Sequence, residues 1–161
     1  MSKAVKKNNT VKLDFNIEYA PAPESKASAS IQPSYDLFIN GKFEKPVSKK
    51  YFDTINPATE EKLSSIAEAN ATDVNKAVKA ARKAYDTTWS KMPVKERAKY
   101  IYRIARMIQE RAREFAVIET LDGGKPIRES RDIDIPLVAN HFFYYAGWAD
   151  KLAYAFPNKK I

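Results

Sequence analysis

The sequence predicts an α+β chain in which short β-hairpin strands come first and four helical segments follow. Between residues 35 and 67, short apolar stretches are separated by turn-forming pairs such as Asn40-Gly41 and Asn56-Pro57. From residue 72 onward, apolar residues recur every three or four positions, which is the period of an α-helix. Strands and helices do not alternate along the chain, so a complete doubly wound parallel sheet is not expected.

The first predicted element is a β-hairpin. Residues 37–39 and Phe43 flank Asn40-Gly41, a pair that tolerates the positive φ angles of a tight two-residue turn. Residues 51–55 are mostly aromatic and β-branched and are followed by Asn56-Pro57, which ends a strand. A further strand is predicted at residues 63–67.

Four helical segments follow these strands. Thr72 is the candidate N-cap of the first helix, with an acidic residue in the turn that follows. Pro93 favours the start of the second helix, Gly123-Gly124 ends the third, and the fourth begins near Pro136. The apolar stripes of these helices consist of Val74, Ala77, Val78, Ala81, Ala84 and Tyr85 in the first helix, Ile101, Ile104, Ala105 and Ile108 in the second, Phe115, Ile118 and Leu121 in the third, and Leu137, Phe142, Phe143, Tyr145, Ala146 and Ala149 in the fourth.

Residues 1–34 are predicted to form a disordered tail. Three prolines and a Lys/Ala/Ser stretch at residues 25–30 leave too little apolar surface to offset the entropy lost on ordering. Residues 13–17 alternate between apolar and polar, so a short strand added to a sheet edge stays open as an alternative.

The net charge of +8 is concentrated, because residues 91–113 hold eight basic residues against two acidic ones. Such a stretch can attract anionic partners, but the solvated face of an amphipathic helix is the favoured explanation, so nucleic-acid binding is not expected. No apolar run approaches the roughly 18 residues of a membrane span. No apolar stretch follows the N-terminal lysines, as a secretory signal would require. A cytoplasmic protein without a membrane partner is therefore expected.

The residues that most often carry chemistry are sparse. The chain has no cysteine, which excludes disulfides, thiolate metal sites and a cysteine nucleophile within it. Its four glycines form no phosphate-binding pattern after a strand. The single histidine, His141, has no second histidine or cysteine with which to share a metal, so it is interpreted as a packed or surface residue.

Six segments within residues 35–161 resemble the aldehyde dehydrogenase family, in the family's order and at about its spacing. They are Phe-Ile-Asn-Gly-Lys-Phe at residues 38–43, Thr-Ile-Asn-Pro-Ala-Thr at 54–59, the helical segment 73–85, the stretch from Trp89 through Pro93 to Arg97, Glu-Thr-Leu-Asp-Gly-Gly-Lys-Pro at 119–126, and Tyr-Tyr-Ala-Gly-Trp-Ala-Asp-Lys at 144–151. Six ordered matches make coincidence improbable, whereas residues 1–34 show no such match.

The resemblance implies an α/β subunit with a nicotinamide-binding Rossmann-like domain, a catalytic domain and a β-hairpin arm for oligomers. Residues 35–161 are then the incomplete N-terminal part of the cofactor-binding domain. In this family a cysteine attacks the aldehyde, hydride passes to NAD or NADP, and water activated by a glutamate releases the acid. These family residues follow the motif that ends at Lys151, so this chain is expected to hold no catalytic or cofactor-binding residue and to be inactive alone.

One family site does begin in this region. Many members bind a monovalent cation, K⁺ or Na⁺, through oxygens near the Thr-x-Asn-Pro strand and the aspartate of the Leu-Asp-x-Gly-Lys-Pro motif. The matching residues are Thr54, Ile55 and Asp122. A hard cation prefers oxygen ligands, and a helix C-terminus favours positive charge. Alternatively, Asp122 only caps the Gly-Gly turn or pairs with Lys125.

Two functions remain open. The first is the N-terminal fragment of an NAD(P)-dependent aldehyde dehydrogenase, which oxidises an aldehyde to a carboxylic acid in the complete subunit. Its expected partners are further copies of the subunit or a complementary downstream fragment. The second is a stand-alone binding or assembly module related to the family, without catalysis. Both would retain the same packing residues, so the motifs alone do not separate them.

Overall fold

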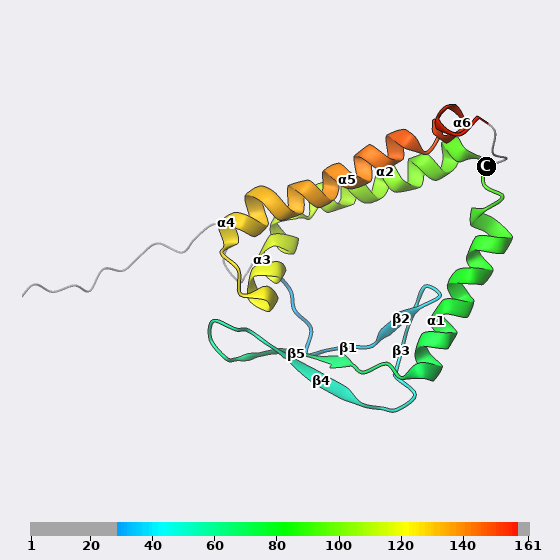
Figure 1. The fold of residues 1–161 in the computed structure, drawn as a ribbon. Coiled ribbons are helices and arrows are strands. Elements are labelled where there is room, and N and C mark those ends of the chain that lie inside the picture. Colours follow the sequence, from blue (N-terminus) through cyan, green and yellow to red (C-terminus); the bar gives the residue numbers. More distant parts are fainter. Residues whose placement is uncertain (1–28, 158–161) are drawn as a thin grey trace, which may run out of the picture.

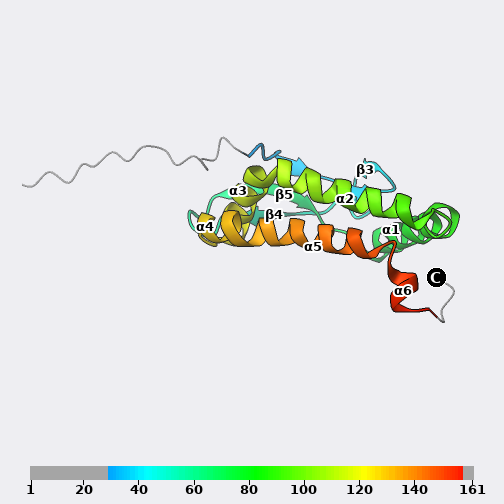
Figure 2. The ribbon, with the colours of Figure 1, turned by 90° about the horizontal axis from the view of Figure 1, so that it is seen from above.

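The computed structural model of the protein describes residues 29–157. Residues 1–28 of the expected tail 1–34, including the alternating residues 13–17, lie outside the described residues. The elements form an open ring in which two small sheets lie below, α1 (Ala71–Ala84) rises at one end, and α2 (Val94–Glu110) and α5 (Ile135–Trp148) run side by side above (Figures 1 and 2). Helix α3 (Ala112–Gly123) returns toward the sheets at the other end (Figure 1). The predicted order of strands followed by four longer helices is therefore confirmed.

The larger sheet has the strand order β1-β5-β4, from β1 (Ser34–Tyr35), β4 (Tyr51–Ile55) and β5 (Lys62–Ala67). Strand β4 pairs antiparallel with β5, and β1 pairs parallel with it. Gln32 and Pro33, which the sequence placed at the end of the tail, are hydrogen bonded to β5. The Ser64 hydroxyl donates to the Gln32 carbonyl at 2.8 Å, and the Ser65 amide donates to the Pro33 carbonyl at 3.0 Å.

The predicted hairpin forms the second sheet, with β2 (Leu37–Ile39) antiparallel to β3 (Lys42–Glu44). Asn40 and Gly41 have φ angles of 53° and 79°, as a two-residue turn of this kind requires. Ile39 is buried, whereas the Phe38 and Phe43 rings, 5.1 Å apart, lie exposed on the other face of the hairpin. The asparagine–glycine signal thus located both the turn and its flanking strands correctly.

The N-cap of helix α1 lies two residues before the predicted one. Asn70, not Thr72, is the N-cap, and its side chain accepts hydrogen bonds from the amides of Thr72 and Asp73. The Asp73 carboxylate accepts in return from the Asn70 amide at 3.1 Å, which completes a capping box. The Asn-x-x-Asp spacing, rather than the nearest threonine, marks the start of this helix.

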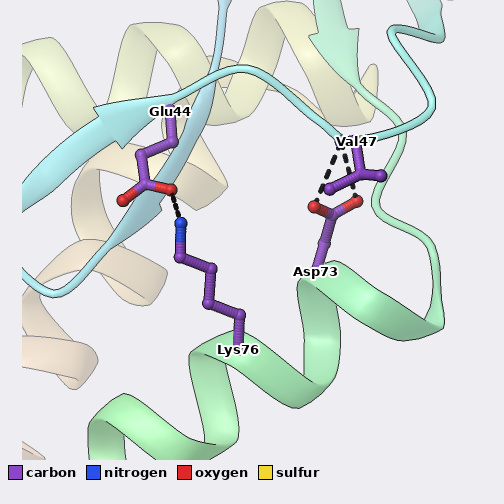
Figure 3. A network of polar contacts seen from close by, with 4 residues as sticks. All are labelled: Glu44, Val47, Asp73 and Lys76. Atoms are coloured by element: carbon purple, nitrogen blue, oxygen red, sulfur yellow. Dashed lines mark hydrogen bonds and ion pairs between the residues drawn. The ribbon is translucent and has the colours of Figure 1, made fainter.

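Helix α1 is attached to the hairpin and its exit loop by two polar contacts (Figure 3). The buried Asp73 carboxylate also accepts hydrogen bonds from the Val47 amide, at 3.2 and 3.3 Å to its two oxygens. One turn further on, Lys76 forms an ion pair with Glu44 of β3. Because Asp73 caps the helix and holds the loop at once, the hairpin and α1 are fixed to each other.

The apolar stripe of α1 is not part of a core within the described residues. Val74 is 52% exposed and Val78 is 60% exposed, and the main contacts of α1 are with β2 and with its own continuation. That continuation is a π-helical segment, η2 (Tyr85–Trp89). The stripe is therefore left uncovered here, as expected if it is meant for a sheet that this chain does not encode, and the helix itself was predicted correctly.

Helices α2 and α5 form the main packed pair of the molecule. Small residues bring the two backbones close together, since Ala105, Ala139 and Ala146 are buried. Tyr102 and Phe143 meet edge to face, with ring centroids 4.9 Å apart. Within residues 29–157, no helix is both long and apolar enough to cross a membrane.

The turn between α3 and α5 contains elements that periodicity did not reveal. After Gly124 come the short helix α4 (Ile127–Glu129) and a second π-helical segment, η3 (Ser130–Asp134). Beyond this turn, another short helix, α6 (Leu152–Ala155), follows α5. Helix α3 ends as predicted, because Gly124 adopts the left-handed φ of 71° and its amide donates to the Thr120 carbonyl.

Candidate cation site

Two of the three predicted cation ligands meet where the ring of elements closes. Thr54 lies in β4, and Asp122 lies in the last turn of α3, 68 positions later in the chain. The Thr54 hydroxyl donates a hydrogen bond to the Asp122 carboxylate. Ile55 follows Thr54 along the strand, so its side chain points to the opposite face and only its backbone oxygen could contribute.

A rigid turn positions Thr54 next to Asp122. The buried Asn56 side chain accepts a hydrogen bond from the Ala58 amide at 3.0 Å, and the Asn56 amide donates to the Glu61 carbonyl at 2.9 Å. The adjoining Pro57 ring packs directly on Gly124, where a Cβ atom would lie 3.1 Å from the Pro57 Cβ and Cγ atoms. A glycine is needed here both for the positive φ angle and for this close approach.

The sheet register changes at the same point. Thr54 is paired with Ser64, but Ile55 is paired with Lys62, so Leu63 is an additional residue in β5. Such β-bulges turn side chains and interrupt the regular ladder. The bulge therefore sets the end of β4, and with it the position of the Thr54 and Ile55 oxygens.

Asp122 does not act as the partner of Lys125. The Lys125 ammonium instead contacts Asp134 at 2.7 Å and Glu119 at 3.1 Å. Its hydrogen bond with Asp134, and next that with Glu119, raise the pKa of Lys125 above the ordinary value. The pairing alternative for Asp122 is thus wrong, and Lys125 joins the end of α3 to η3.

The donor set suits a hard monovalent cation better than a transition metal. Asp122 supplies one carboxylate at a helix C-terminus, where the free carbonyls carry partial negative charge. Thr54 adds a hydroxyl oxygen. In residues 29–157, no three His, Asp or Glu side chains are grouped as metal ligands. The oxygen atoms of Thr54 and Asp122 are ligands of the kind that K⁺ or Na⁺ accepts.

The sequence did not reveal a groove that adjoins this oxygen pair. A hollow of about 690 Å³ separates one face of the larger sheet from α3. Phe52 and Ile66 line it from the sheet, and Ile118 lines it from the helix. Arg111 and Glu114 form an ion pair of 2.7 Å along its wall, and the hydrogen bond from Arg111 lowers the pKa of Glu114. We call this hollow the sheet–helix groove.

The other candidate residues show no converging chemistry in the described part of the chain. His141 lies exposed on α5, in keeping with a surface histidine. In the basic stretch, Lys99 pairs with Glu96 at 2.7 Å and Arg106 pairs with Glu110 at 3.7 Å. These pairs lie on the solvated side of α2, as an amphipathic helix would place them.

This α+β arrangement is found in larger α/β enzymes of known structure. The aldehyde dehydrogenase of Bacillus cereus, solved as an NAD⁺ complex, is 40% identical to the chain, with a TM-score of 0.72 over 80% of the chain and 26% of that structure. The defining pattern of the aldehyde dehydrogenase family matches residues 43–160. The chain belongs to the aldehyde dehydrogenase family.

Two curated relatives show the same extent of similarity. Benzaldehyde dehydrogenase, mitochondrial, from Antirrhinum majus is 42% identical over 135 residues, which is 83% of this chain and 25% of that protein. Aldehyde dehydrogenase, mitochondrial, from Rattus norvegicus is 44% identical over 117 residues, or 71% of this chain and 22% of that protein. The chain therefore spans about a quarter of the length of the relatives it matches.

Proposed function

We propose that this chain is the N-terminal part of an NAD(P)-dependent aldehyde dehydrogenase, which oxidises an aldehyde to a carboxylic acid in the complete subunit. The observation that carries the proposal is the match to the Bacillus cereus enzyme in its NAD⁺ complex, at 40% identity and a TM-score of 0.72. In the complete subunit, NAD or NADP would accept the hydride.

The residues of this chain act as a frame rather than as reacting groups. The chain contains no cysteine that could attack an aldehyde. Its role is to hold the hairpin, the larger sheet and the α2–α5 pair in fixed positions, through contacts such as those of Asp73 and Gly124. Residues 35–161 would then belong to a cofactor-binding domain that further polypeptide completes.

The test is complementation. Residues 1–161 are co-expressed with the Bacillus cereus enzyme lacking its matching segment, and NADH formation is measured with several aldehydes. We expect turnover from the pair and none from either part alone. Turnover from residues 1–161 alone would contradict the proposed division of roles. A stable pair without turnover would favour the alternative, a binding or assembly module without catalysis.

We also propose that Thr54, Ile55 and Asp122 hold K⁺ or Na⁺. The contact between the Thr54 hydroxyl and the Asp122 carboxylate supports this site, because it places two oxygens at a helix C-terminus. A cation there would join β4 to α3 and so stabilise the closure of the ring. It would have no part in hydride transfer.

The proposed setting is the cytoplasm, with further copies of the subunit or a complementary fragment as partners. The absence of cysteine is compatible with a reducing compartment. Fractionation of cells that express the tagged protein tests the compartment, and recovery in organelles would contradict it. Nucleic acid is not among the proposed partners, because the basic residues of α2 are partly paired with acidic neighbours.

A further inference from the structure

The turn of the β2–β3 hairpin carries the one asparagine of the chain that precedes a glycine. Asn40 and Gly41 are both exposed, and the pairing of the two strands ends at Ile39 and Lys42. The backbone amide of Gly41 therefore lies outside the hydrogen-bonded ladder. A Cβ atom added at Gly41 would meet no atom within 4 Å beyond its chain neighbours, so there is open space around this amide.

The other four asparagines of residues 29–157 are constrained in ways that the turn asparagine is not. Asn56 is buried and precedes Pro57, which has no backbone N–H. Asn70 caps α1 with its side chain, and Asn75 and Asn140 lie inside α1 and α5. Inside a helix, the backbone nitrogen that follows each asparagine donates to the carbonyl of the preceding turn. Only the turn asparagine is followed by an exposed glycine amide outside regular hydrogen bonding.

We propose that Asn40 is a site of spontaneous deamidation, and that the isoaspartate formed there uncouples the hairpin from α1. In the first step, the Gly41 nitrogen loses its proton to a base in the solvent and attacks the side-chain carbonyl carbon of Asn40. The new carbon–nitrogen bond closes a succinimide ring. The bond from that carbon to the side-chain nitrogen breaks, and this nitrogen takes up a proton and leaves as ammonia. Glycine favours the step because it has no side chain to obstruct the attack.

Water completes the reaction without any change in oxidation state. When water adds to the main-chain carbonyl carbon of Asn40, the bond from that carbon to the ring nitrogen breaks, and the chain continues through the former side chain as isoaspartate. When water adds to the other carbonyl carbon, an ordinary aspartate results. Both products carry a carboxylate in place of a neutral amide, so the net charge of +8 falls by one unit.

Isoaspartate also lengthens the main chain of the turn by one methylene group. Turn type and loop length fix the register of a hairpin. The observed register goes with a two-residue turn whose φ angles are 53° at Asn40 and 79° at Gly41. The lengthened turn no longer matches this register, so the pairing of β2 with β3 is weakened.

The weakened pairing reaches α1 through β3 and its exit loop (Figure 3). Glu44 of β3 forms the ion pair with Lys76, and the Val47 amide donates to the Asp73 carboxylate at 3.2 and 3.3 Å. Further along α1, Val78 is 60% exposed, so apolar packing there does not replace these polar contacts when they are lost. The proposal concerns this chain itself and is independent of the reaction that the complete subunit catalyses.

Two substitutions at the same position supply matched controls. Asn40→Gly removes the reacting amide, and Asn40→Asp introduces the negative charge of the products without the additional methylene group. Gly-Gly and Asp-Gly both favour the same kind of hairpin turn as Asn-Gly, so each variant retains the local geometry. Thermal melts of the freshly purified proteins check that the fold is retained.

The experiment incubates the full chain in mildly alkaline buffer and follows each asparagine by peptide mass spectrometry, with fragmentation that separates isoaspartate from aspartate. We expect Asn40 to react at least about tenfold faster than Asn75 or Asn140, because a helix must first unwind locally at those two positions. The rate at Asn40 should rise with pH, because the attacking nitrogen must be deprotonated.

Amide hydrogen exchange on the same samples follows the Val47 amide. We expect this amide to exchange about tenfold faster in the isoaspartate form than in fresh protein, because its hydrogen bond to Asp73 opens more often. Fresh Asn40→Asp and incubated Asn40→Gly should both exchange at the rate of fresh wild type.

Conversion at Asn40 no faster than at Asn75 and Asn140 would overturn the modification site. Unchanged exchange of the Val47 amide after conversion would overturn the uncoupling from α1. Equally fast exchange in fresh Asn40→Asp would assign the effect to the charge and overturn the role of the lengthened turn. Equally fast exchange in incubated Asn40→Gly would show that incubation loosens the hairpin without deamidation, and would overturn the proposed cause.

Discussion

The contact between Gly124 and Pro57 allows a sharp prediction about how the ring of elements closes. Gly124 has a φ angle of 71°, and an alanine in the left-handed region costs about 1–2 kcal/mol. Its Cβ atom would also lie 3.1 Å from two atoms of the Pro57 ring. The Pro57 ring belongs to a turn that the buried Asn56 holds in place, so the ring cannot move away freely. The close contact therefore adds roughly 1 kcal/mol to the cost of the substitution. We expect Gly124→Ala to destabilise the chain by about 2–3 kcal/mol.

The neighbouring glycine provides the control. Gly123 lies within α3, and a Cβ atom there would meet no atom within 4 Å. Alanine stabilises the middle of a helix by roughly 0.5–1 kcal/mol relative to glycine, and Gly123 is the last residue of α3, so Gly123→Ala should be slightly stabilising. The two substitutions are adjacent and chemically identical, yet they should have opposite effects.

Urea unfolding followed by helical ellipticity measures both free energies of unfolding under the same conditions. An equal effect of the two variants on the free energy of unfolding would refute the prediction. A Gly124→Ala protein as stable as the wild type would refute it as well. Either result would mean that the turn at Asn56-Pro57 does not press on the end of α3, and that Thr54 and Asp122 are positioned by other contacts.

Three further outcomes are expected. Asp122→Ala should reduce the rise in melting temperature that K⁺ or Na⁺ produces in the wild type, and equal rises in both proteins would leave Asp122 as a helix cap only. Lys62 and Ser65 lower the pKa of Asp53, and Arg111 lowers that of Glu114, so the stability from these carboxylates is present near neutral pH and lost as pH falls below about 4 through their lowered pKa values. Melts from pH 7 to pH 2.5 should therefore show a shallower loss for Asp53→Asn, and an unchanged slope would count against this pair. Residues 1–161 alone should self-associate in light scattering, because α1 and α5 expose apolar side chains, and a monomer that melts cooperatively above roughly 60 °C would contradict this.

Local signals in the sequence located most elements of the fold. Asn40-Gly41 predicts a turn and Gly123-Gly124 predicts a helix end, because these pairs favour particular backbone conformations. Such preferences depend on one or two residues, so they can be predicted without knowledge of the tertiary structure. The same reasoning failed at the start of α1, where the nearest threonine was preferred. Reciprocal hydrogen bonds between Asn70 and Asp73 determine which residue is the N-cap. Predicting this cap requires that the two residues be considered as a pair.

Burial was harder to predict than secondary structure. The period of Val74 and Val78 indicates a helix, but it does not say what covers the apolar face, and within the described residues these side chains are half exposed. The π-helical segments η2 and η3 have no distinct periodic signal. The sheet–helix groove was also missed, because it depends on how far α3 stands from β4 rather than on any motif.

The candidate site depended on the resemblance to a family. Nothing local links Thr54 to Asp122 across 68 positions, and the family motif supplied the pairing. The structure then added what the motif lacks. Pro57 packs on Gly124, and the Asn56 side chain holds the turn that carries Pro57. These contacts explain how two segments distant in the sequence are held next to each other.

The separation of those segments along the chain also bears on the order of folding. The hairpin and the β4–β5 pair join residues close in sequence, so they close small loops. The contact of Thr54 with Asp122 closes a loop of 68 residues, whose entropic cost exceeds that of a 10-residue loop by roughly 1.7 kcal/mol. Strand pairs and helices should therefore form first, with the ring closing afterward. A contact made after the rate-limiting step affects mainly the unfolding rate, so in kinetic experiments Gly124→Ala should accelerate unfolding and leave refolding nearly unchanged.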